Sequence, residues 1–514
     1  MRSAHDRGLD VAAGNCTQMT RRTLLQSPLA VGSLAIAAAS PASALAQGTP
    51  QDDAHEPGSP NLALALAQLF HRTSFGDLSP TAIKHAKMII ASTLASAAPG
   101  SHIGSAGIVR ELAKERGGRP EATVWFDSAK LPVTEAARVD AMLSDAAASD
   151  DSDLRNVAHT GTTLTATGLA IAERMDATGP DLLCAMVTGY EAAGRIGEAL
   201  HNGRQGLHAS MIAAFGGVVA TAKLLGLTTE QMAHAICMTA TSMGGLLIGT
   251  DSWAREYQAG NAALCAVNAA LAAGRGFAVN EDLLEAKGGF LEVYGNGKPD
   301  IRSVTREIGA DCDIVKYLAI KLVPGAHALH PSVEAAVNAA RQAETPPEEV
   351  AKILLSGPQK GSITYSKQPP KDMIEAIHSL PYFVASAVAD KDFSWVHITP
   401  EKIHRPVVAR LIGLVEYDPA PAAFHYDWNW GGTVTIVTKS GARFTSTVDA
   451  PRGSGPRGIE WGDVDAKYRA LLPDSRLPAN RVEELLNMIH DFDQVKHVSQ
   501  FTRLLHRKGE ASFR

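Results

Sequence analysis

The sequence predicts a mainly α fold, with long helical segments on both sides of a shorter α+β segment. Apolar residues recur with helical spacing from Asn61 to about Lys321. Short runs of β-branched and apolar residues then interrupt this pattern, and helical spacing returns after Gly458. Only 5% of the residues are aromatic, and Ala and Gly take their place, a composition that suits closely packed helices.

Composition excludes several classes of protein. Of the 514 residues, 45% are hydrophobic and 20% are charged, which is ordinary for a globular protein of two or three domains. A mainly disordered chain, a collagen-like repeat and a disulfide-dense mini-protein are therefore excluded. The net charge is -6, and acidic and basic residues are mixed along the chain. Because this leaves no long basic face, we expect no nucleic-acid partner.

The first 46 residues have the features of an export signal. The pair Arg21-Arg22 precedes a mildly apolar stretch at 28–46, which ends in the small-x-small pattern Ala44-Leu45-Ala46. We interpret residues 1–46 as a twin-arginine signal peptide that is cut before Gln47. The sequence thus predicts a periplasmic protein that is exported by the twin-arginine machinery.

This segment has two alternative interpretations, a disordered tail and a single membrane anchor. Pro28, Pro41 and several Ser make it a poor membrane-spanning helix. No later segment is long and apolar enough to span a membrane, so we expect no stable membrane insertion. Translation from Met19 instead of Met1 is a further alternative, because a long stretch precedes the arginine pair.

A helical domain is expected to begin after a polar, Pro-containing linker at 47–60, with its first part at 61–318. Little of this part has strand character. Its clearest helical patterns lie at 134–148, 162–177, 180–200, 209–225 and 229–243. The segment Gly260–Gly274 is so rich in Ala that we expect it to be buried on several sides.

An α+β segment is predicted at 319–458. Its expected strands are 350–356, 432–438 and 443–448, and a turn at Lys439-Ser440-Gly441 joins the last two. Helical patterns lie between these strands, at 333–342 and 382–389. The helical part resumes at 459–514, with patterns at 464–472 and 479–491.

The first motif that can carry chemistry is an acidic cluster, Asp150-Asp151-Ser152-Asp153, followed by His159. Three carboxylates in four residues repel one another unless they are solvated or paired. A catalytic pocket at the end of a helix is one interpretation. The alternative is a solvated helix cap and loop.

Two further motifs stand at the beginnings of expected helices. His208 precedes a long apolar helix, where the helix N-terminus lowers the pKa of an imidazole and favours a neutral base or hydrogen-bond donor. The alternative is a histidine that merely caps the helix. Arg255 leads into the Ala-rich helix, where a guanidinium can clamp a substrate carboxylate. The alternative is a surface pair between Arg255 and Glu256.

Two weaker motifs lie in the α+β segment. His327 and His330 are three residues apart and can hold a metal in principle, but no third ligand with suitable spacing is evident. Tyr382 stands at a helix start, where it can donate a proton or serve as a core tyrosine. The sequence contains no P-loop, HExxH or GxSxG motif, and no GxGxxG lies between a strand and a helix. Nucleotide-dependent chemistry and zinc proteolysis therefore have no support.

The order and spacing of several stretches resemble the MmgE/PrpD family, also called the 2-methylcitrate dehydratase family. The resemblance runs from about Asn61 to Asp491. Its stretches are Asp150-Asp151-Ser152, Gly189-Tyr190-Glu191 with Arg195, Gly206-Leu207-His208, 222–227, Ala259-Gly260-Asn261-Ala262-Ala263, Ser379-Leu380-Pro381-Tyr382, Pro451-Arg452-Gly453 and Asp465-Ala466-Lys467-Tyr468. Together they are specific for the family, and less so for one reaction.

The resemblance implies a fold and an assembly. The N-terminal part and the C-terminal tail would build a large all-helical domain, and the α+β segment would be a smaller lid domain inserted between them. Members of the family usually form homodimers. Their active site lies in the cleft between the two domains and needs no metal or other cofactor.

The resemblance also implies a set of site residues. The family has Asp-x-Asp-Asp-Thr before an active-site His. Asp150, Asp151 and Ser152 match the last three positions, whereas the first Asp falls on Ala148. His159 matches the histidine, with about one residue inserted.

The remaining matches come from later segments. His208 matches the histidine of a Gly-Phe-His motif, and Lys321 matches the lysine that opens the lid segment. A substrate-binding lysine of the family falls on Arg255, which keeps the positive charge but changes the geometry. Tyr382 matches the tyrosine after Ser-Leu-Pro.

The chemistry implied is abstraction of a proton next to a carboxylate, with departure or movement of a β group. This needs a base, an acid for the leaving group and cations for the carboxylates. His159 and His208 are the expected acid–base pair, and Asp150 or Asp151 would orient a histidine. The expected substrate-binding residues are Ser152, Arg255 and Lys321.

The sequence therefore favours a metal-independent, dehydratase-like lyase that acts on a small di- or tricarboxylate or hydroxy acid. Ala148, Arg255 and the export signal favour a substrate other than 2-methylcitrate. An isomerase, epimerase or decarboxylase of the same family is an alternative. A non-catalytic periplasmic carboxylate-binding protein on the same fold is another, and a purely structural periplasmic protein is the third.

Overall fold

The computed structural model describes residues 61–507, except 201–205, 251, 296–298, 309–311, 358–367 and 419–430. The predicted signal peptide (1–46) and linker (47–60) lie outside the described residues, so both stay predictions. Among the described residues, no helix combines the length and the apolar character needed to cross a membrane.

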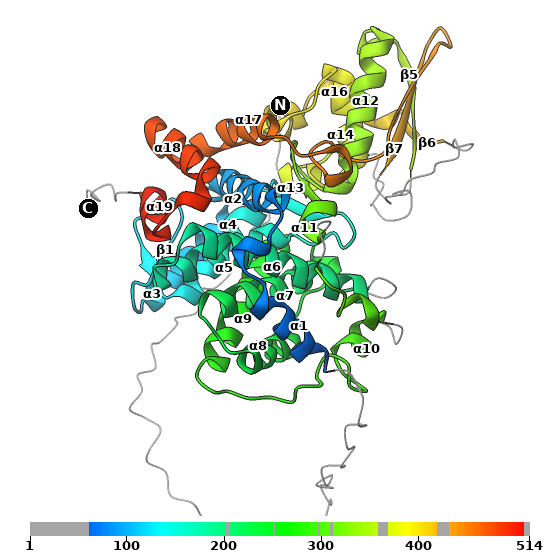
Figure 1. Cartoon of the computed structure of the whole chain (residues 1–514). Coiled ribbons are helices and arrows are strands. Elements are labelled where there is room, and N and C mark those ends of the chain that lie inside the picture. Colours follow the sequence, from blue (N-terminus) through cyan, green and yellow to red (C-terminus); the bar gives the residue numbers. More distant parts are fainter. Residues whose placement is uncertain are drawn as a thin grey trace, which may run out of the picture. The chain divides into compact units, whose positions relative to one another are not determined.

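The N-terminal part is a bundle of helices (Figure 1). Its helices are α1 (Leu62–Arg72), α2 (Pro80–Gly100), α3 (Gly104–Arg116), α4 (Val133–Ala146), α5 (Thr160–Met175), α6 (Gly179–Ala199), α7 (Ser210–Leu224), α8 (Thr229–Ser242), α9 (Ala254–Ala273), α10 (Phe290–Tyr294) and α11 (Asp313–Lys316). Local sequence sets several of their starts. Asn61 accepts a hydrogen bond from the backbone of Leu64 at α1, and Thr228 and Gln231 form a capping box at α8.

Two pairs of short strands accompany these helices, although little strand character was expected in this region. β1 (Ala122–Thr123) pairs with β2 (Lys130–Leu131), and β3 (Asp151–Asp153) pairs with β4 (Leu318–Ile320), both antiparallel. These strands have two or three residues each, too few for an alternating pattern to be visible in the sequence. The β3–β4 pair matters most, because it joins segments that are far apart in the chain.

The α+β segment contains the three predicted strands and a fourth strand, β6, that the sequence analysis did not predict. Its strand order is β6 (Val415–Tyr417), β5 (Val350–Ser356), β7 (Gly432–Thr438), β8 (Arg443–Val448), with β5–β7 and β7–β8 antiparallel and β5–β6 parallel. Its helices are α12 (His330–Ala343), α13 (Met373–Ala376), α14 (Leu380–Asp390), α15 (Pro400–Ile403) and α16 (Pro406–Gly413). α12 packs on β7 and β8, and α14 packs on α12 and α16 (Figure 1).

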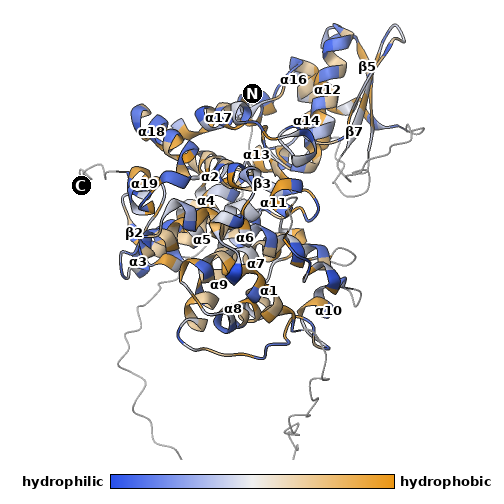
Figure 2. Cartoon of the chain, viewed as in Figure 1, coloured by the Kyte–Doolittle hydropathy of each residue, from blue (hydrophilic) through white to orange (hydrophobic). Residues whose placement is uncertain are grey.

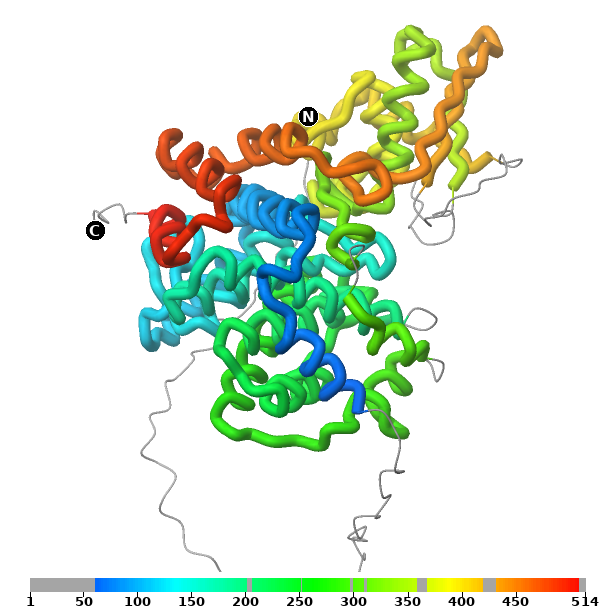
Figure 3. The backbone as a smooth tube through the Cα atoms, viewed as in Figure 1, coloured from blue at the N-terminus to red at the C-terminus, as the bar shows by residue number. Residues whose placement is uncertain are grey.

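The last helices return to the N-terminal bundle. They are α17 (Trp461–Leu471), α18 (Ala479–His490) and α19 (Val498–Leu505). α17 and α18 pack on α2, and α19 packs on α5; Figure 3 shows this red segment beside the blue α2. α18 carries hydrophilic and hydrophobic residues in alternation (Figure 2), and its buried residues Val482, Leu485, Leu486 and Ile489 form one face.

The predicted fold class, mainly α with a small sheet in the C-terminal half, is confirmed. The predicted helices are present, with ends shifted by a few residues. The largest shift concerns α9, which begins at Ala254 instead of Gly260, so that Arg255 and Glu256 lie in its first turn. A tertiary contact explains this, because the Arg255 guanidinium bonds to the end of α4.

Closely spaced backbones explain the abundance of glycine in the bundle. A Cβ added to Gly189 on α6 would lie 2.6 Å from the carbonyl oxygen of Gly216 on α7. A Cβ added to Gly216 would lie 2.7 Å from the carbonyl oxygen of Gly189. The two helices therefore approach each other through a reciprocal pair of glycines.

Substitution of this pair should destabilise the protein. We expect Gly189→Ala to lower the free energy of unfolding by about 1–3 kcal/mol, because the backbones must separate. The control is Gly462→Ala on α17, where a Cβ meets nothing within 4 Å, so that it should be neutral or stabilising by up to about 1 kcal/mol. Chemical denaturation of both variants measures this, and equal stabilities would contradict the close approach.

Candidate active site

The β3–β4 pair brings the two halves of the candidate site together. Ser152 pairs with Ala319 in the middle of this ladder, and the backbone N–H of Lys321 donates to the carbonyl of Asp150 at 3.1 Å. Asp150 therefore stands just before β3 and Lys321 just after β4. Both side chains are almost completely buried.

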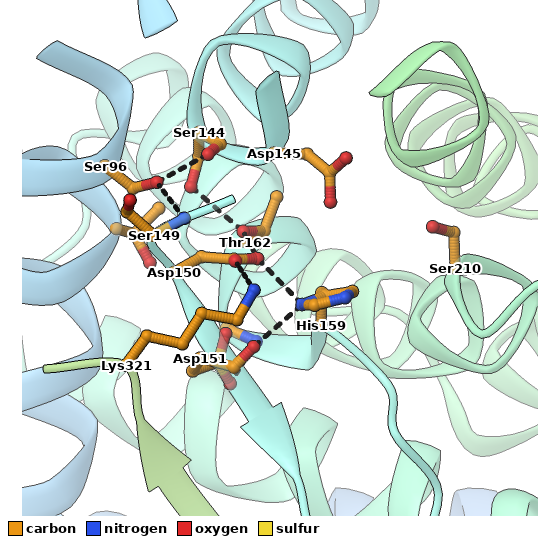
Figure 4. Close-up of polar contacts among 12 residues, drawn as sticks. Ser96, Ser144, Asp145, Ser149, Asp150, Asp151, His159, Thr162, Ser210 and Lys321 are labelled. Carbon is orange, nitrogen blue, oxygen red and sulfur yellow. Dashed lines mark hydrogen bonds and ion pairs between the residues drawn. The ribbon is translucent and has the colours of Figure 1, made fainter. Parts of the chain in front are cut away.

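The Asp150 carboxylate is the centre of the site (Figure 4). Its Oδ1 accepts from the Lys321 ammonium at 2.8 Å, and its Oδ2 accepts from the Thr162 hydroxyl at 2.8 Å. The same Oδ2 lies 3.1 Å from Nδ1 of His159. Burial opposes ionisation, but the positive charges of His159 and Lys321 outweigh it and hold the pKa of Asp150 well below its usual value.

His159 is oriented by two acceptors on one side of its ring. Nδ1 lies 2.8 Å from the carbonyl oxygen of Asp151, in addition to its contact with Asp150. Because both partners accept, we assign the proton to Nδ1, which leaves Nε2 free to take up a proton in the neutral ring. Burial disfavours the imidazolium, but the Asp150 carboxylate outweighs it and raises the pKa of His159.

Asp151 has a different electrostatic state from its neighbour. Its Oδ2 accepts from the backbone N–H of Gly161 at 3.0 Å, whereas its Oδ1 is buried with no hydrogen-bond partner among the described residues. Burial and the nearby negative charge of Asp150 raise the pKa of Asp151 to about 7. Below about pH 6, Asp150 is therefore charged whereas Asp151 is largely neutral.

The acidic cluster is not the solvated loop that was the alternative interpretation. Residues 150–153 are all buried, and three of them form β3. Asp153 accepts from the backbone of Arg155 and Asn156 and supports the turn that follows. The Ser152 hydroxyl is buried with no partner among the described residues. Its expected role in substrate binding stays a prediction.

Asp145 is a site residue that the sequence analysis missed. It lies on α4, and one oxygen of its carboxylate accepts from Nε of Arg255 at 2.9 Å. Nη2 of Arg255 donates to the backbone carbonyls of Asp145 and Ala146. Arg255 is therefore a buried residue bound to α4, and the alternative of a surface pair with Glu256 is wrong. Arg255 and Asp150 come from distant segments, and Asp145 links them.

Asp145, Asp150 and His159 form a cluster of metal-ligand type. One ligand atom of each lies within 4.8 Å of those of the other two. Two of these three residues already have cationic partners, because Arg255 lies 2.9 Å from Asp145 and Lys321 lies 2.8 Å from Asp150. A divalent ion would face both cations at close range. The charge balance fits proton transfer better than metal binding.

His327 and His330 form a pair whose environment differs from that of the Asp145–Asp150–His159 cluster. The rings of His327 and His330 lie 4.6 Å apart between centroids, and both are buried. Burial lowers the pKa of His330 to about 3 and that of His327 well below its usual value. Among the described residues, no third ligand brings this pair into a metal-type cluster. His327 is close enough to Lys321 and His159 for their charges to act on it.

His208 is joined to the same region through backbone contacts. Its N–H donates to the carbonyl of Gly245 at 3.2 Å, and Gln258 on α9 donates to the carbonyl of Leu246. Nδ1 of His208 lies 2.9 Å from the Ser210 hydroxyl and accepts from the backbone N–H of Ser210. Figure 4 shows the Ser210 side chain on the same side of His159 as Asp145. His208 thus caps α7 and also lies in the loops that hold the start of α9.

Family models match nearly all of the described chain. The MmgE/PrpD N-terminal domain matches residues 64–302, and the MmgE/PrpD C-terminal domain matches residues 324–494. The chain belongs to the MmgE/PrpD family. The predicted resemblance is therefore confirmed.

Three similar proteins share one name, cis-aconitate decarboxylase. The human cis-aconitate decarboxylase is 25% identical over 86% of this chain and 94% of its own length. The mouse enzyme of the same name is 24% identical over 86% of this chain and 92% of its own length. The cis-aconitate decarboxylase of Aspergillus terreus is 27% identical over 64% of this chain and 71% of its own length.

This MmgE/PrpD protein departs from the expected motif at Ala148, the position at which the resemblance placed an Asp. Ala148 adopts a left-handed backbone conformation with φ 49°. The nearby carboxylate of Asp145 reaches the His159–Asp150 cluster instead. The carboxylate of Asp145, three residues before Ala148, thus lies beside His159. No spacing rule in the sequence indicated this placement.

Among the described residues, Tyr382 makes no contact with Asp145, Asp150 or His159. Its side chain is fully buried in the core of the α+β segment, and its hydroxyl donates to the carbonyl of His397. This matches the alternative of a core tyrosine, and the proton-donor role has no geometric support. A small cavity is lined by Arg255, Trp253 and Met373 among others, but not by Asp150, His159 or Lys321.

The raised pKa of Asp151 predicts a pH-dependent stability. The folded protein retains this proton up to about pH 7, whereas the unfolded chain loses it near pH 3.8, so wild-type stability falls as pH rises through this window. Asp151→Asn removes the effect. We expect the free energy of unfolding of the variant, relative to wild type, to rise by about 2 kcal/mol between pH 5 and pH 8.

Chemical denaturation at several pH values measures this difference. The control is Asp474→Asn, an exposed aspartate, whose difference from wild type should stay constant across the same range. A constant difference for Asp151→Asn would mean that Asp151 ionises normally inside the fold.

Proposed function

We propose that the protein is a lyase that acts on a small di- or tricarboxylate by moving a proton at a carbon next to a carboxylate, without a metal. The observation that carries this proposal is the buried set Asp150, His159 and Lys321. In this set, Nδ1 of His159 faces two acceptors, and Nε2 is free to act. The ammonium of Lys321 is buried close by. Such a set suits a general base next to an anion-binding group.

His159 takes the role of the base. Its Nδ1–H is held by Asp150 and by the Asp151 carbonyl, so Nε2 can abstract the carbon-bound proton. The Asp150 carboxylate then stabilises the imidazolium that forms. The His159 side chain is 16% exposed, so a proton taken up at Nε2 can exchange with solvent. His208 is the candidate acid for the leaving group or for the product carbon.

Two cations have hydrogen-bond donors left for a substrate carboxylate. An ammonium has three donors, and among the described residues Lys321 uses one of them, on Asp150. Nε and Nη2 of Arg255 bond to α4, whereas its Nη1 makes no bond within the described part of the chain. Because both groups are buried, an anionic ligand would satisfy donors that water reaches poorly.

The relatives support a tricarboxylate substrate and leave the bond that breaks undecided. They are named as decarboxylases, and in decarboxylation the bond to a carboxylate carbon breaks and the product carbon gains a proton. Elimination of water from a hydroxy acid, which the sequence favoured, uses the same base and the same carboxylate clamps. We propose both as candidate reactions, with isomerisation and ligand binding without turnover as the outcomes that would replace them.

The first experiment detects proton transfer directly. We would incubate the chain from residue 47 in D2O with cis-aconitate, citrate and malate and record proton NMR spectra. We expect deuterium to enter beside a carboxylate, and His159→Gln to slow this by about 10²-fold or more. His208→Gln should slow net turnover. The control is His497→Gln, because that histidine is half-exposed and pairs with Asp176.

The products separate the candidate reactions. Release of CO2 from cis-aconitate indicates decarboxylation, and a vinylic signal from citrate or malate without CO2 indicates loss of water. Deuterium incorporation without net product indicates an isomerase or epimerase. A thermal shift with no exchange in any sample would refute the lyase and favour a carboxylate-binding protein.

Removal of metal ions should not change the activity. Lys321 and Arg255 already neutralise two of the three residues in the metal-type cluster, so we expect the exchange rate after EDTA treatment to stay within about twofold of the untreated rate. Loss of the rate, with recovery after addition of Mg²⁺ or Zn²⁺, would show that the cluster holds a metal. Dimerisation and periplasmic export stay predictions of the sequence.

A further inference from the structure

Lys467 is a buried lysine that the proposed reaction does not use. It lies on α17, and its side chain enters the helical bundle behind Asp150. Its ammonium donates to the Ser92 hydroxyl on α2 at 2.6 Å and to the backbone carbonyls of Ser149 and Asp150, the latter at 3.4 Å. The side chain thus reaches the backbone of the candidate site from a segment more than 300 residues later in the sequence.

The turn that Lys467 contacts is a strained one. Ala148 has a positive φ of 49°, a conformation that residues other than glycine seldom adopt. The backbone N–H of Ser149 donates to Ser96, and the Ser149 hydroxyl donates to the Ala147 carbonyl. The carbonyl of Ser149 receives its described hydrogen bond from Lys467. Without Lys467, this carbonyl would be left unpaired in a buried turn.

The charged form of Lys467 matches its surroundings. Three acceptors surround the ammonium, which has three N–H groups to donate. The titratable groups that face it are Asp150, Asp151, Lys321 and His330, and the Trp395 ring of the 3₁₀ helix Trp395–Ile398 lies 6.0 Å away. Burial lowers the pKa of Lys467 to about 7, although the charge of Asp150 opposes this effect. If Lys467 were neutral, the lone pair of its amine would face one of these three acceptors, which is unfavourable.

We propose that Lys467 is a positioning residue, which holds the turn at Ser149–Asp150 so that the Asp150 carboxylate stays in contact with His159 and Lys321. This inference rests on the proposed function for the roles of Asp150 and His159. Lys467 touches protein atoms only, so it acts through Asp150. The C-terminal helix α17 therefore completes the candidate site instead of only covering the bundle.

The competing explanation is that Lys467 merely fastens α17 to α2. Lys87 offers a matched control for this explanation. Lys87 lies on α2 and donates to the His490 carbonyl and to Asp493, so it also joins α2 to the C-terminal segment. Lys87 has no described contact with the Asp150 turn. A loss of fastening alone should therefore affect Lys87→Met and Lys467→Met alike.

The decisive measurement is the titration of His159 by NMR in protein with ¹³C-labelled histidine, with His159→Gln to assign the signal. If Lys467 positions Asp150, Lys467→Met lets the carboxylate move away, and the pKa of His159 falls by at least about 1 unit, a tenfold change in proton affinity. If Lys467 acts only as a nearby charge, its removal raises the pKa of His159. The direction of the change therefore separates positioning from a purely electrostatic effect, and the Lys87 control tests fastening.

Two further variants complete the test. Lys467→Gln keeps hydrogen-bond donors without the charge, so we expect the pKa of His159 to fall less than in Lys467→Met. If Lys467→Met does not fold, the result for Lys467→Gln is decisive. Lys87→Met should leave the titration of His159 unchanged while it lowers the melting temperature. An unchanged or raised pKa of His159 in both Lys467 variants would overturn the proposal.

Kinetics give an independent measure once a substrate is known. We expect Lys467→Met to lower kcat by at least about tenfold and to change KM less, because Asp150 orients the base His159, whereas Lys321 keeps the ammonium that would bind substrate. The NMR titration needs no substrate. A silent substrate panel would therefore refute the proposed function and leave the positioning role of Lys467 to be decided by the His159 titration.

Discussion

The ion pair between Lys321 and Asp150 is the interaction on which the candidate site depends. Both groups are removed from water, and a buried carboxylate without a partner would take up a proton instead of staying charged. Lys321 prevents this, and Asp150 then fixes the ring of His159 and raises its pKa. The β3–β4 ladder makes the ion pair possible, because it aligns two segments that are 171 residues apart. Loss of either partner would leave an uncompensated charge, which typically costs about 3–5 kcal/mol.

The charges of this region are balanced in pairs. Arg255 compensates Asp145 and Lys321 compensates Asp150, while Asp151 retains its proton below about pH 7. His159 lies beside both compensated carboxylates. A site of this kind leaves cationic donors for an anionic substrate without carrying a large net charge of its own. The low dielectric around these groups makes each contact stronger than it would be in water.

Membership of the MmgE/PrpD family describes the scaffold better than it describes the site. The resemblance placed an expected aspartate at Ala148 and an expected lysine at Arg255. In the structure these two positions are connected, because Arg255 binds Asp145 and Asp145 lies beside His159. Asp145 thus brings a carboxylate close to His159 from α4, and Arg255 compensates its charge. The two differences from the expected motif therefore lie in one local arrangement.

Local patterns were enough to predict the helices, the strands β5, β7 and β8, the family, and Asp150, His159 and Lys321 as candidate site residues. Periodic burial sets the helices, a tight turn sets the β7–β8 hairpin, and motif order sets the family. The folded structure alone showed that Asp145 lies beside this set, that Lys467 contacts it and that Tyr382 lies in a separate core. It also decided that the acidic cluster is buried on a strand of three residues. These features arise from contacts between segments far apart in the chain, and the free energy of such contacts depends on packing, which no local pattern encodes.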